Sequence, residues 1–182
     1  MVEDQSYPRV KKFFFLFIFI LSFSKANSEN FKFVKIANLN NPWGSSFLNN
    51  DEMIITEKGG LIKIVNIINN QVNDVEHNLN FLEDGQGGLL DILHQENKVW
   101  ISYTENRGNR KTSTSIALAN LDKKNLVFKN IFQANPPINS GYHFGSRLAI
   151  KDNYLYASAG ERGKGMIAQD ASKHPGSIIR IH

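Results

Sequence analysis

The stretch Gly145-Ser-Arg-Leu-Ala-Ile150, Lys151-Asp-Asn153, Tyr154-Leu-Tyr-Ala-Ser-Ala-Gly-Glu161 holds two apolar runs on either side of a short polar turn. Two such runs joined by a tight turn are typical of an antiparallel β-hairpin. Two earlier stretches, 44–57 and 88–105, repeat the order of glycine, apolar run, polar turn, apolar run and glutamate. We interpret the three stretches as copies of one structural unit.

The spacing of the copies indicates the fold. Their opening glycines, Gly44, Gly88 and Gly145, lie 44 and then 57 residues apart. Several short strands repeated at this spacing are typical of β-propeller blades, whereas a β-sandwich predicts the strands but not the repeat. We therefore predict an all-β chain, an incomplete β-propeller with about three to four blades, each a four-stranded antiparallel sheet. The strand-like runs are 31–36, 53–56, 61–67, 99–103, 115–121, 148–150, 154–158 and 177–181.

The third hairpin predicts a pair of chemically active side chains. If its turn centres on Asp152, residues whose numbers add to 304 lie opposite one another, provided that no bulge intervenes. His143 then faces Glu161 at the open end of the hairpin. A carboxylate beside an imidazole fixes the ring tautomer and stabilises positive charge, which prepares a general base.

The same construction in the other two copies brings further side chains to one rim of the central channel. We expect Glu57 and Glu105 to have structural roles, and Trp43 and Trp100 to fill blade cores. The expected pairs are Trp43 with Glu57, and Gln86 with Asn106 beside Glu105.

The beginning of the chain has the layout of a secretory signal peptide. Basic residues precede the apolar run 13–23, and Ser24-Lys25-Ala26 offers small residues at a cleavage site. An uncleaved membrane anchor is the alternative, but eleven apolar residues fall short of the roughly 20 that a spanning helix needs. We expect a signal peptide at 1–26, a propeller domain at 27–182, no stable membrane span after cleavage, and export to the periplasm or the medium.

Charge and composition exclude several functions. Without residues 1–26, which hold four basic and two acidic residues, the chain has 17 basic and 15 acidic groups. This balance argues against a nucleic-acid partner. The chain has no cysteine, so its fold must depend on its core. His94 and His174 lack the spacing of metal ligands, and we predict no metal site.

An ordered set of motifs resembles the glucose/sorbosone dehydrogenase family, the soluble pyrroloquinoline-quinone (PQQ)-dependent aldose sugar dehydrogenases. The resemblance extends from about residue 34 to the C-terminus, in the family's order. The motifs are Asn41-Pro-Trp-Gly44, Asp84-Gly-Gln-Gly-Gly-Leu-Leu-Asp91, His143-Phe-Gly-Ser-Arg-Leu148, Gly160-Glu-Arg-Gly163, Ala168-Gln-Asp170 and His174-Pro-Gly-Ser-Ile-Ile-Arg-Ile181.

The resemblance implies a six-bladed propeller that oxidises the anomeric hydroxyl of an aldose to a lactone, with PQQ as hydride acceptor and with calcium. In that family the histidine at the position of His143 takes the hydroxyl proton. Gln86 matches a glutamine at the substrate and cofactor site. Glu161 stands where the family usually has an aspartate that bonds the histidine, and it is one methylene longer.

The resemblance covers only the family's N-terminal half. The second half supplies the cations that hold the quinone carboxylates and the calcium ligands. We therefore expect this chain to be truncated and inactive alone. One alternative is a non-catalytic propeller fragment that binds sugar or a protein, with self-association through its open sheet edges. Another is an unstable remnant without function.

Overall fold

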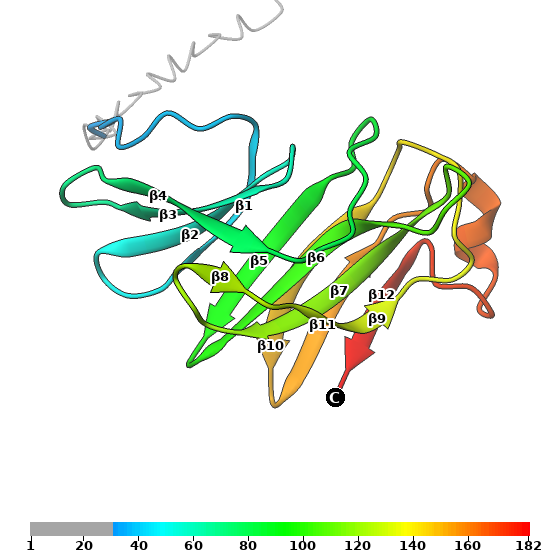
Figure 1. Ribbon diagram of the computed structural model, residues 1–182. Helices are drawn as coiled ribbons and strands as arrows, with labels where there is room; N and C mark the ends of the chain where they lie inside the picture. Colours follow the sequence, from blue (N-terminus) through cyan, green and yellow to red (C-terminus); the bar gives the residue numbers. More distant parts are fainter. Residues whose placement is uncertain (1–30) are drawn as a thin grey trace, which may run out of the picture. The chain divides into compact units, whose positions relative to one another are not determined.

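The computed structural model describes residues 31–182 (Figure 1). The predicted signal peptide at 1–26 lies outside the described residues. Lys35–His182 form one compact unit. The strand predicted at 31–36 is wrong, because residues 31–39 pair with no other strand, and Phe31 and Phe33 are exposed. Within the described residues, no helix has the length and apolar character to cross a membrane.

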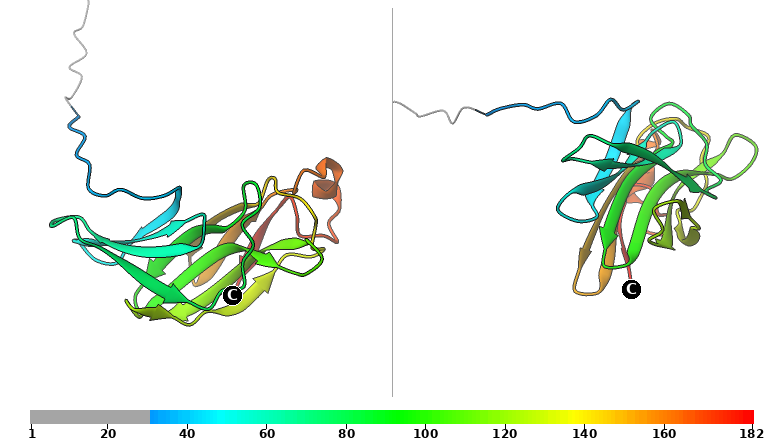
Figure 2. Two further views of the ribbon diagram at one scale, coloured as in Figure 1. Left: turned by 45° about the horizontal axis from the view of Figure 1, so that its top comes forward. Right: turned by 60° about the vertical axis from the view of Figure 1, so that its left-hand side comes forward.

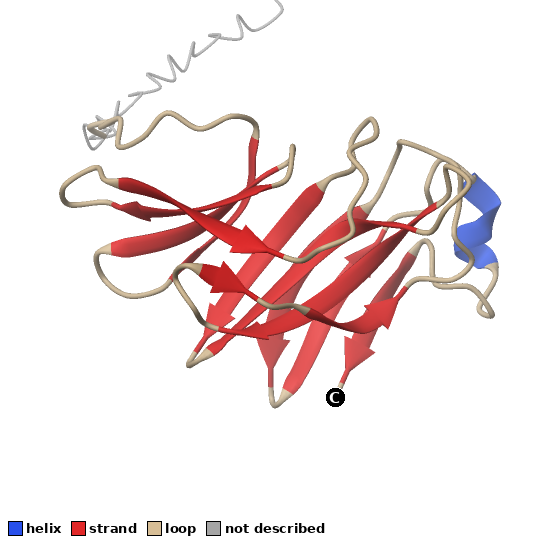
Figure 3. Cartoon of the chain, in the orientation of Figure 1, coloured by secondary structure: helices blue, strands red, loops and turns tan. Residues whose placement is uncertain are grey.

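The regular secondary structure of the described chain is almost entirely β-strand (Figure 3). One short 3-10 helix, η1, covers Gly165–Gln169 and follows β11. The strands are β1 (Pro42–Phe47), β2 (Glu52–Glu57), β3 (Leu61–Asn66), β4 (Val72–His77), β5 (Leu89–Gln95), β6 (Lys98–Asn106), β7 (Thr112–Asn120), β8 (Asn125–Leu126), β9 (Lys129–Gln133), β10 (Gly145–Lys151), β11 (Tyr154–Ala159) and β12 (Ser177–Ile181).

Three sheets follow one another along the chain, and we call them blades 1, 2 and 3. Blade 1 has the antiparallel order β1-β2-β3-β4, with β8 added in parallel to β4, and blade 2 has the order β5-β6-β7-β9. Blade 3 has the order β10-β11-β12 within the described residues. The first strand of each sheet contacts the first strand of the next, and Figure 2 shows the three sheets from two further sides. The predicted propeller of antiparallel blades is confirmed, with four strands in blade 2 and departures in the other two.

Each blade opens with a hairpin whose first strand carries a β-bulge. The bulge leaves two residues of the first strand opposite one residue of the second, which bends the strand and increases its twist. It falls at the same place in all three blades. The pairs on either side are Pro42↔Glu57 and Ser45↔Ile55, Leu89↔Tyr103 and Ile92↔Ile101, and Gly145↔Ala159 and Leu148↔Ala157.

The bulges correct the repeat that we inferred from sequence. Pro42, not Trp43, pairs with Glu57. Glu57 therefore corresponds to Tyr103 of blade 2, and it is not the counterpart of Glu161. Five residues lie between the last paired residues of the blade 1 hairpin, Phe47 and Met53, against two in the hairpins of blades 2 and 3. The first copy in the sequence is therefore out of register with the other two.

Two apolar cores hold the blades together. One core joins blades 1 and 2 and includes Ile54 and Leu89, while the other joins blades 2 and 3 and includes Ile116 and Leu148. Trp100 packs against the second core as expected. The same expectation is wrong for Trp43, whose residue is 45% exposed.

Buried hydroxyl groups add a polar link at each blade interface. Thr56 Oγ1 accepts a hydrogen bond from the Gly44 N–H in its own blade and donates to the Leu90 carbonyl in blade 2. Ser102 Oγ accepts from the Asp91 N–H and donates to the Ser146 carbonyl of blade 3, at 3.0 and 2.7 Å. Because these donors and acceptors are buried, each hydroxyl satisfies groups that would otherwise destabilise the interface.

Candidate active site at the open end of blade 3

The structure brings His143 and Glu161 together. His143 lies just before β10 and Glu161 just after β11, so the two strands deliver them to the same end of the hairpin (Figure 1). The residue numbers of paired residues in this hairpin add to 305 near the turn, and to 304 beyond the bulge, at Gly145↔Ala159. His143 Nδ1 hydrogen-bonds Glu161 Oε1, and the side chains are 53% and 27% exposed.

The contact fixes the tautomer of the ring. An ionised carboxylate can only accept hydrogen bonds, so Nδ1 carries the proton and Nε2 keeps its lone pair. The Gly163 N–H also donates to Glu161 Oε1, at 3.1 Å, and orients the carboxylate. These two donors, the His143 ring first, lower the pKa of Glu161 below its ordinary value of 4.5. Glu161 is therefore a carboxylate at neutral pH.

Gln86 joins His143 by a contact that the sequence did not predict. The side-chain Oε1 of Gln86 accepts from the His143 backbone N–H at 2.9 Å, and the backbone N–H of Gln86 donates to the Gly141 carbonyl at 2.8 Å. Gln86 does not pair with Asn106, whose N–H donates to the Asn80 carbonyl instead. The loop before β5 and the loop before β10 therefore hold each other.

The backbone around His143 is strained and tightly packed. His143 has a φ of 50°, in the left-handed region that few residues other than glycine occupy. A Cβ added to Gly160 would lie 2.0 Å from the His143 carbonyl oxygen, so this position must be glycine. Strained backbone that its surroundings hold in place is frequent at functional sites.

Arg162 supports the same loop, and sequence analysis missed it. Its residue is 2% exposed, and its guanidinium lies 3.6 Å from the centre of the Phe144 ring. It donates to the Tyr142 carbonyl, to both oxygens of Thr112 and to the Ser140 carbonyl. An arginine between a glutamate and a glycine in a loop resembles a solvated residue, so no local pattern indicates its burial.

Burial also sets the ionisation of Arg162. Loss of solvent lowers its pKa to about 10, although the charge of Asp84 acts in the opposite direction. The guanidinium therefore stays charged at neutral pH and depends on carbonyl and hydroxyl oxygens for its stabilisation. Removing one of these oxygens would leave a buried donor unsatisfied.

Glu57 and Glu105 do not join this site. Glu57 is buried and accepts from the Asn40 N–H at 2.7 Å. Glu105 lies within blade 2, where it accepts from Ser115, Asn130 and Gln133. Their hydrogen bonds agree with the structural roles that we expected, but neither reaches His143.

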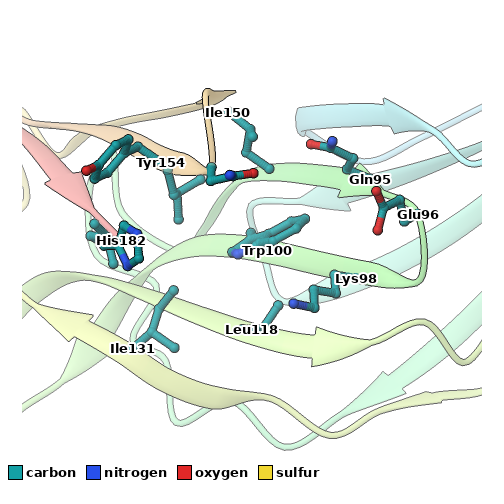
Figure 4. Close-up of a pocket in the computed structure, with 12 residues that line it drawn as sticks. Gln95, Glu96, Lys98, Trp100, Leu118, Ile131, Ile150, Tyr154 and His182 are labelled. Carbon is teal, nitrogen blue, oxygen red and sulfur yellow. The ribbon is translucent and has the colours of Figure 1, made fainter.

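A cavity of about 360 Å³ lies between blades 2 and 3, with Trp100 among its lining residues (Figure 4). It is also lined by Ile150 and Tyr154, which flank the β10–β11 turn, and by Glu96 of the β5–β6 turn. His143 and Glu161 are at the opposite end of the β10–β11 hairpin. The cavity is therefore separate from the candidate active site.

The groups beside His143 do not by themselves fit PQQ. A quinone with several carboxylates needs cationic partners, but the guanidinium of Arg162 already donates to backbone and side-chain oxygens of the protein. Lys58 Nζ, near the Gln86 loop, donates to the Gly85 carbonyl and pairs with Glu83. In residues 31–182, no three or more His, Asp or Glu side chains are grouped so as to hold a metal ion.

The bulged hairpins, the two inter-blade cores and the order of the sheets define this chain as part of a β-propeller. The sequence profile of the Glucose / Sorbosone dehydrogenase family matches residues 39–182. The chain belongs to this family.

Known proteins of similar sequence and structure agree with this assignment. Aldose sugar dehydrogenase YliI of Escherichia coli (strain K12) is 30% identical over an alignment of 153 residues that covers 79% of this chain and 41% of that protein. The crystal structure of the soluble E. coli aldose sugar dehydrogenase in its apo-form superposes with a TM-score of 0.74 at 28% identity, over 79% of this chain and 44% of that one.

A more distant structure shows the fold alone. The PQQ-bound form of aldose sugar dehydrogenase from Streptomyces coelicolor gives a TM-score of 0.69 at 23% identity, over 79% of this chain and 45% of that one. The chain thus spans less than half the length of each of these relatives.

Proposed function

We propose that this chain supplies the proton-accepting part of a PQQ-dependent aldose sugar dehydrogenase. The observation that carries the proposal is the hydrogen bond between His143 Nδ1 and Glu161, which leaves Nε2 free to accept a proton. Membership of the family and the sugar dehydrogenase relatives support the substrate class.

In the proposed reaction, Nε2 of His143 accepts the proton of the anomeric hydroxyl. Glu161 stabilises the imidazolium that forms, and Gln86 holds the backbone of His143 in place. Oxidation of the sugar to a lactone would also require an acceptor for the C1–H electron pair as hydride. When bound, PQQ would supply the hydride acceptor. Arg162 and Lys58 already donate to protein oxygens, so our proposal for this chain does not extend to how the quinone is held.

We further propose that the chain is exported, with residues 1–26 as a signal peptide, as the sequence pattern suggests. Expression in E. coli followed by N-terminal sequencing tests this. A mature protein that starts at Asn27 in the periplasmic fraction is expected. An intact N-terminus in the cytoplasm would contradict it.

A chimera tests the catalytic role of His143. Residues 27–182 are joined to the C-terminal remainder of the E. coli relative, and dye reduction is measured with aldoses, PQQ and calcium. We expect His143→Gln to reduce kcat by about 100-fold or more, as loss of a general base does. His174→Gln, which changes a histidine away from the site, is the control. Full turnover by the His143→Gln chimera would show that His143 is not the base.

The chain by itself should not turn over sugar. The reason is that Arg162 and Lys58 are already engaged with protein groups, which leaves the carboxylates of PQQ without these two cations. Purified chain mixed with aldose, PQQ and calcium should therefore give no dye reduction above a blank. Robust reduction would contradict this part of the proposal.

Sugar binding without oxidation is the second candidate function. It is favoured because Gln86, His143 and Glu161 offer hydrogen-bonding groups at one place, while Arg162 and Lys58 already donate to protein oxygens. Titration of the chain with aldoses, followed by NMR of the His143 ring, separates the two functions. Aldose binding at the His143 ring, together with a chimera that shows no turnover, would favour this second function.

A further inference from the structure

Lys58 of blade 1 contacts the loop that precedes β5 and carries Gln86. It directly follows β2, and its Nζ donates to the Gly85 carbonyl at 2.9 Å. The same Nζ lies 3.3 Å from Glu83 Oε1, and the lysine side chain is 20% exposed. The Lys58 carbonyl accepts from the Leu89 N–H at 3.1 Å. One residue of blade 1 thus holds three points of this segment.

The ammonium of Lys58 and the carbonyl of Gly141 hold a single peptide group from opposite sides. This group joins Gly85 to Gln86. Its carbonyl accepts from Lys58 Nζ at 2.9 Å, and its N–H donates to the Gly141 carbonyl at 2.8 Å. Because a trans peptide group is planar and its N–H and C=O point in opposite directions, these two bonds fix its orientation. Blade 1 and the loop before blade 3 therefore meet on this group.

The orientation of this peptide group decides where the Gln86 side chain points. The peptide nitrogen is bonded to the Cα of Gln86, from which the side chain starts. The side-chain Oε1 accepts from the His143 N–H at 2.9 Å. Gly141, which binds the peptide N–H, is two residues before His143. Rotation of the peptide group would therefore disturb both contacts with the loop of His143.

A lysine is suited to hold this peptide group. A hydrogen bond from a charged donor is shorter and stronger than one between neutral groups, so the ammonium of Lys58 binds the Gly85 carbonyl firmly. The carboxylate of Glu83 balances the charge of the ammonium. Inside the loop, the Gly87 N–H donates to the Asp84 carbonyl at 2.8 Å, which keeps the turn tight but does not orient it relative to blade 1.

We infer that Lys58 is a positioning residue for His143, which acts through the peptide group between Gly85 and Gln86. This inference rests on the function proposed above, because it gives the proton-accepting histidine a support from blade 1. A change of Lys58 should then alter how His143 is held, although the two residues belong to different blades.

Hydrogen exchange of the His143 amide, followed by NMR, tests this support directly. Lys58→Met removes the ammonium and keeps an unbranched side chain. We expect the His143 N–H to exchange about three- to tenfold faster in this variant, the effect of weakening one hydrogen bond. Amides at the centre of β6 should keep their rates. Lys58→Arg, whose guanidinium can also donate to the Gly85 carbonyl, should restore slow exchange.

Lys63→Met is the matched control. Lys63 is another lysine of blade 1, its side chain is 15% exposed, and its Nζ lies 2.6 Å from Asp74 Oδ1. An equal rise of His143 exchange in the two methionine variants would overturn the inference. Equal acceleration at His143 and at the centre of β6 would overturn it too, because Lys58 would then stabilise the fold as a whole.

The chimera of residues 27–182 with the E. coli remainder adds a kinetic readout. Lys58→Met should reduce kcat about three- to tenfold and change the KM for the aldose by less than about twofold, since the lysine supports the base and not the sugar. An unchanged kcat, or a raised KM alone, would contradict the positioning role. If His143→Gln left turnover intact, the proposed function would fail, whereas the exchange rates would still decide whether Lys58 positions His143.

Discussion

At the scale of single residues, the site depends on how His143 is held. Its ring donates to Glu161, its backbone N–H donates to Gln86, and its φ is left-handed. Arg162 ties the preceding loop to β7 through Thr112. A mobile imidazole would spend part of its time in the wrong tautomer or orientation. These contacts therefore prepare the ring before any ligand arrives.

Glu161→Gln should release the ring tautomer. The amide can donate as well as accept, so Nδ1 no longer needs to carry the proton. We expect ¹⁵N NMR of the His143 ring to show a mixture of tautomers in this variant and one tautomer in the unchanged chain. Glu161→Asp, which retains a carboxylate, is the control and should keep most of the preference. An unchanged spectrum for Glu161→Gln would show that the carboxylate does not set the tautomer.

The lowered pKa of Glu161 predicts how the contact responds to acid. A carboxyl with a lower pKa in the folded chain stabilises that state fully above its unfolded value, near 4.5, and loses this effect as pH falls through the folded value. The ¹³C shift of the Glu161 carboxyl should therefore titrate below 4.5 in the folded chain. In urea it should return to about its ordinary value. A folded-state midpoint at or above 4.5 would contradict the contact.

Arg162→Lys should destabilise the fold although it keeps the charge. A lysine cannot reproduce the planar set of donors that reaches Tyr142, Thr112 and Ser140, and it leaves buried oxygens unsatisfied. We expect a loss of about 2–3 kcal/mol in the free energy of unfolding, measured by urea denaturation. The exposed Arg110 offers a control, because Arg110→Lys should change stability by less than about 0.5 kcal/mol. Equal effects of the two changes would refute this role of Arg162.

At the scale of elements, the bulged hairpin is the unit that the chain repeats. The bulge exposes a carbonyl on the first strand, and a hydroxyl from the preceding blade reaches it at both described interfaces. The N–H of the next bulge residue donates to the hydroxyl of its own blade. One serine or threonine thus fixes both the bulge and the position of the next blade.

Ser102→Ala should therefore cost more than a surface hydroxyl. It leaves the Asp91 N–H and the Ser146 carbonyl buried without their partner, for a loss of about 2 kcal/mol by thermal or urea unfolding. Ser172→Ala, at an exposed serine, should stay within about 0.5 kcal/mol. Ser102→Thr keeps the hydroxyl and should retain more stability than Ser102→Ala. A loss for Ser102→Ala no larger than that for Ser172→Ala would show that the Ser102 hydroxyl does not stabilise the interface between blades 2 and 3.

At the scale of the whole molecule, the compact unit Lys35–His182 has no blade with a core of its own. Ile62 of blade 1 packs in one core with Ile92 of blade 2, and Ile116 of blade 2 packs in the other with Leu155 of blade 3. Since blade 2 contributes to both cores, we expect a destabilising substitution at one interface to lower the stability of the other interface as well.

Ile62→Ala should lower the stability of all three blades together. Truncating a fully buried isoleucine costs about 3 kcal/mol through lost apolar burial and the cavity left behind. In a Trp43→Phe background, Trp100 fluorescence reports the blade 2–3 core, and far-UV circular dichroism reports all strands. We expect both transitions to move to lower urea together. A Trp100 transition that does not move would show that the blades unfold independently.

The meeting of His143 with Glu161 was predicted correctly, but from a turn centred on Asp152 without a bulge, whereas the turn lies at Asp152-Asn153 and a bulge changes the pair sum from 305 to 304. The sequence by itself determined the class of fold and the order of the hairpins. These follow from local alternation, short polar turns and a repeat of about 50 residues, all of which are written along the chain. Strands β4, β8 and β9 escaped it because their apolar pattern is weak, and β8 depends on pairing with β4.

Only the tertiary structure decided the register of the blades, the contact of Gln86 with His143 and the burial of Arg162. A bulge shifts every later pair by one residue, and no local pattern marks where it falls. Gln86 and Arg162 find their partners in segments far away in sequence, whose distance from them is set by the packing of one blade on the next.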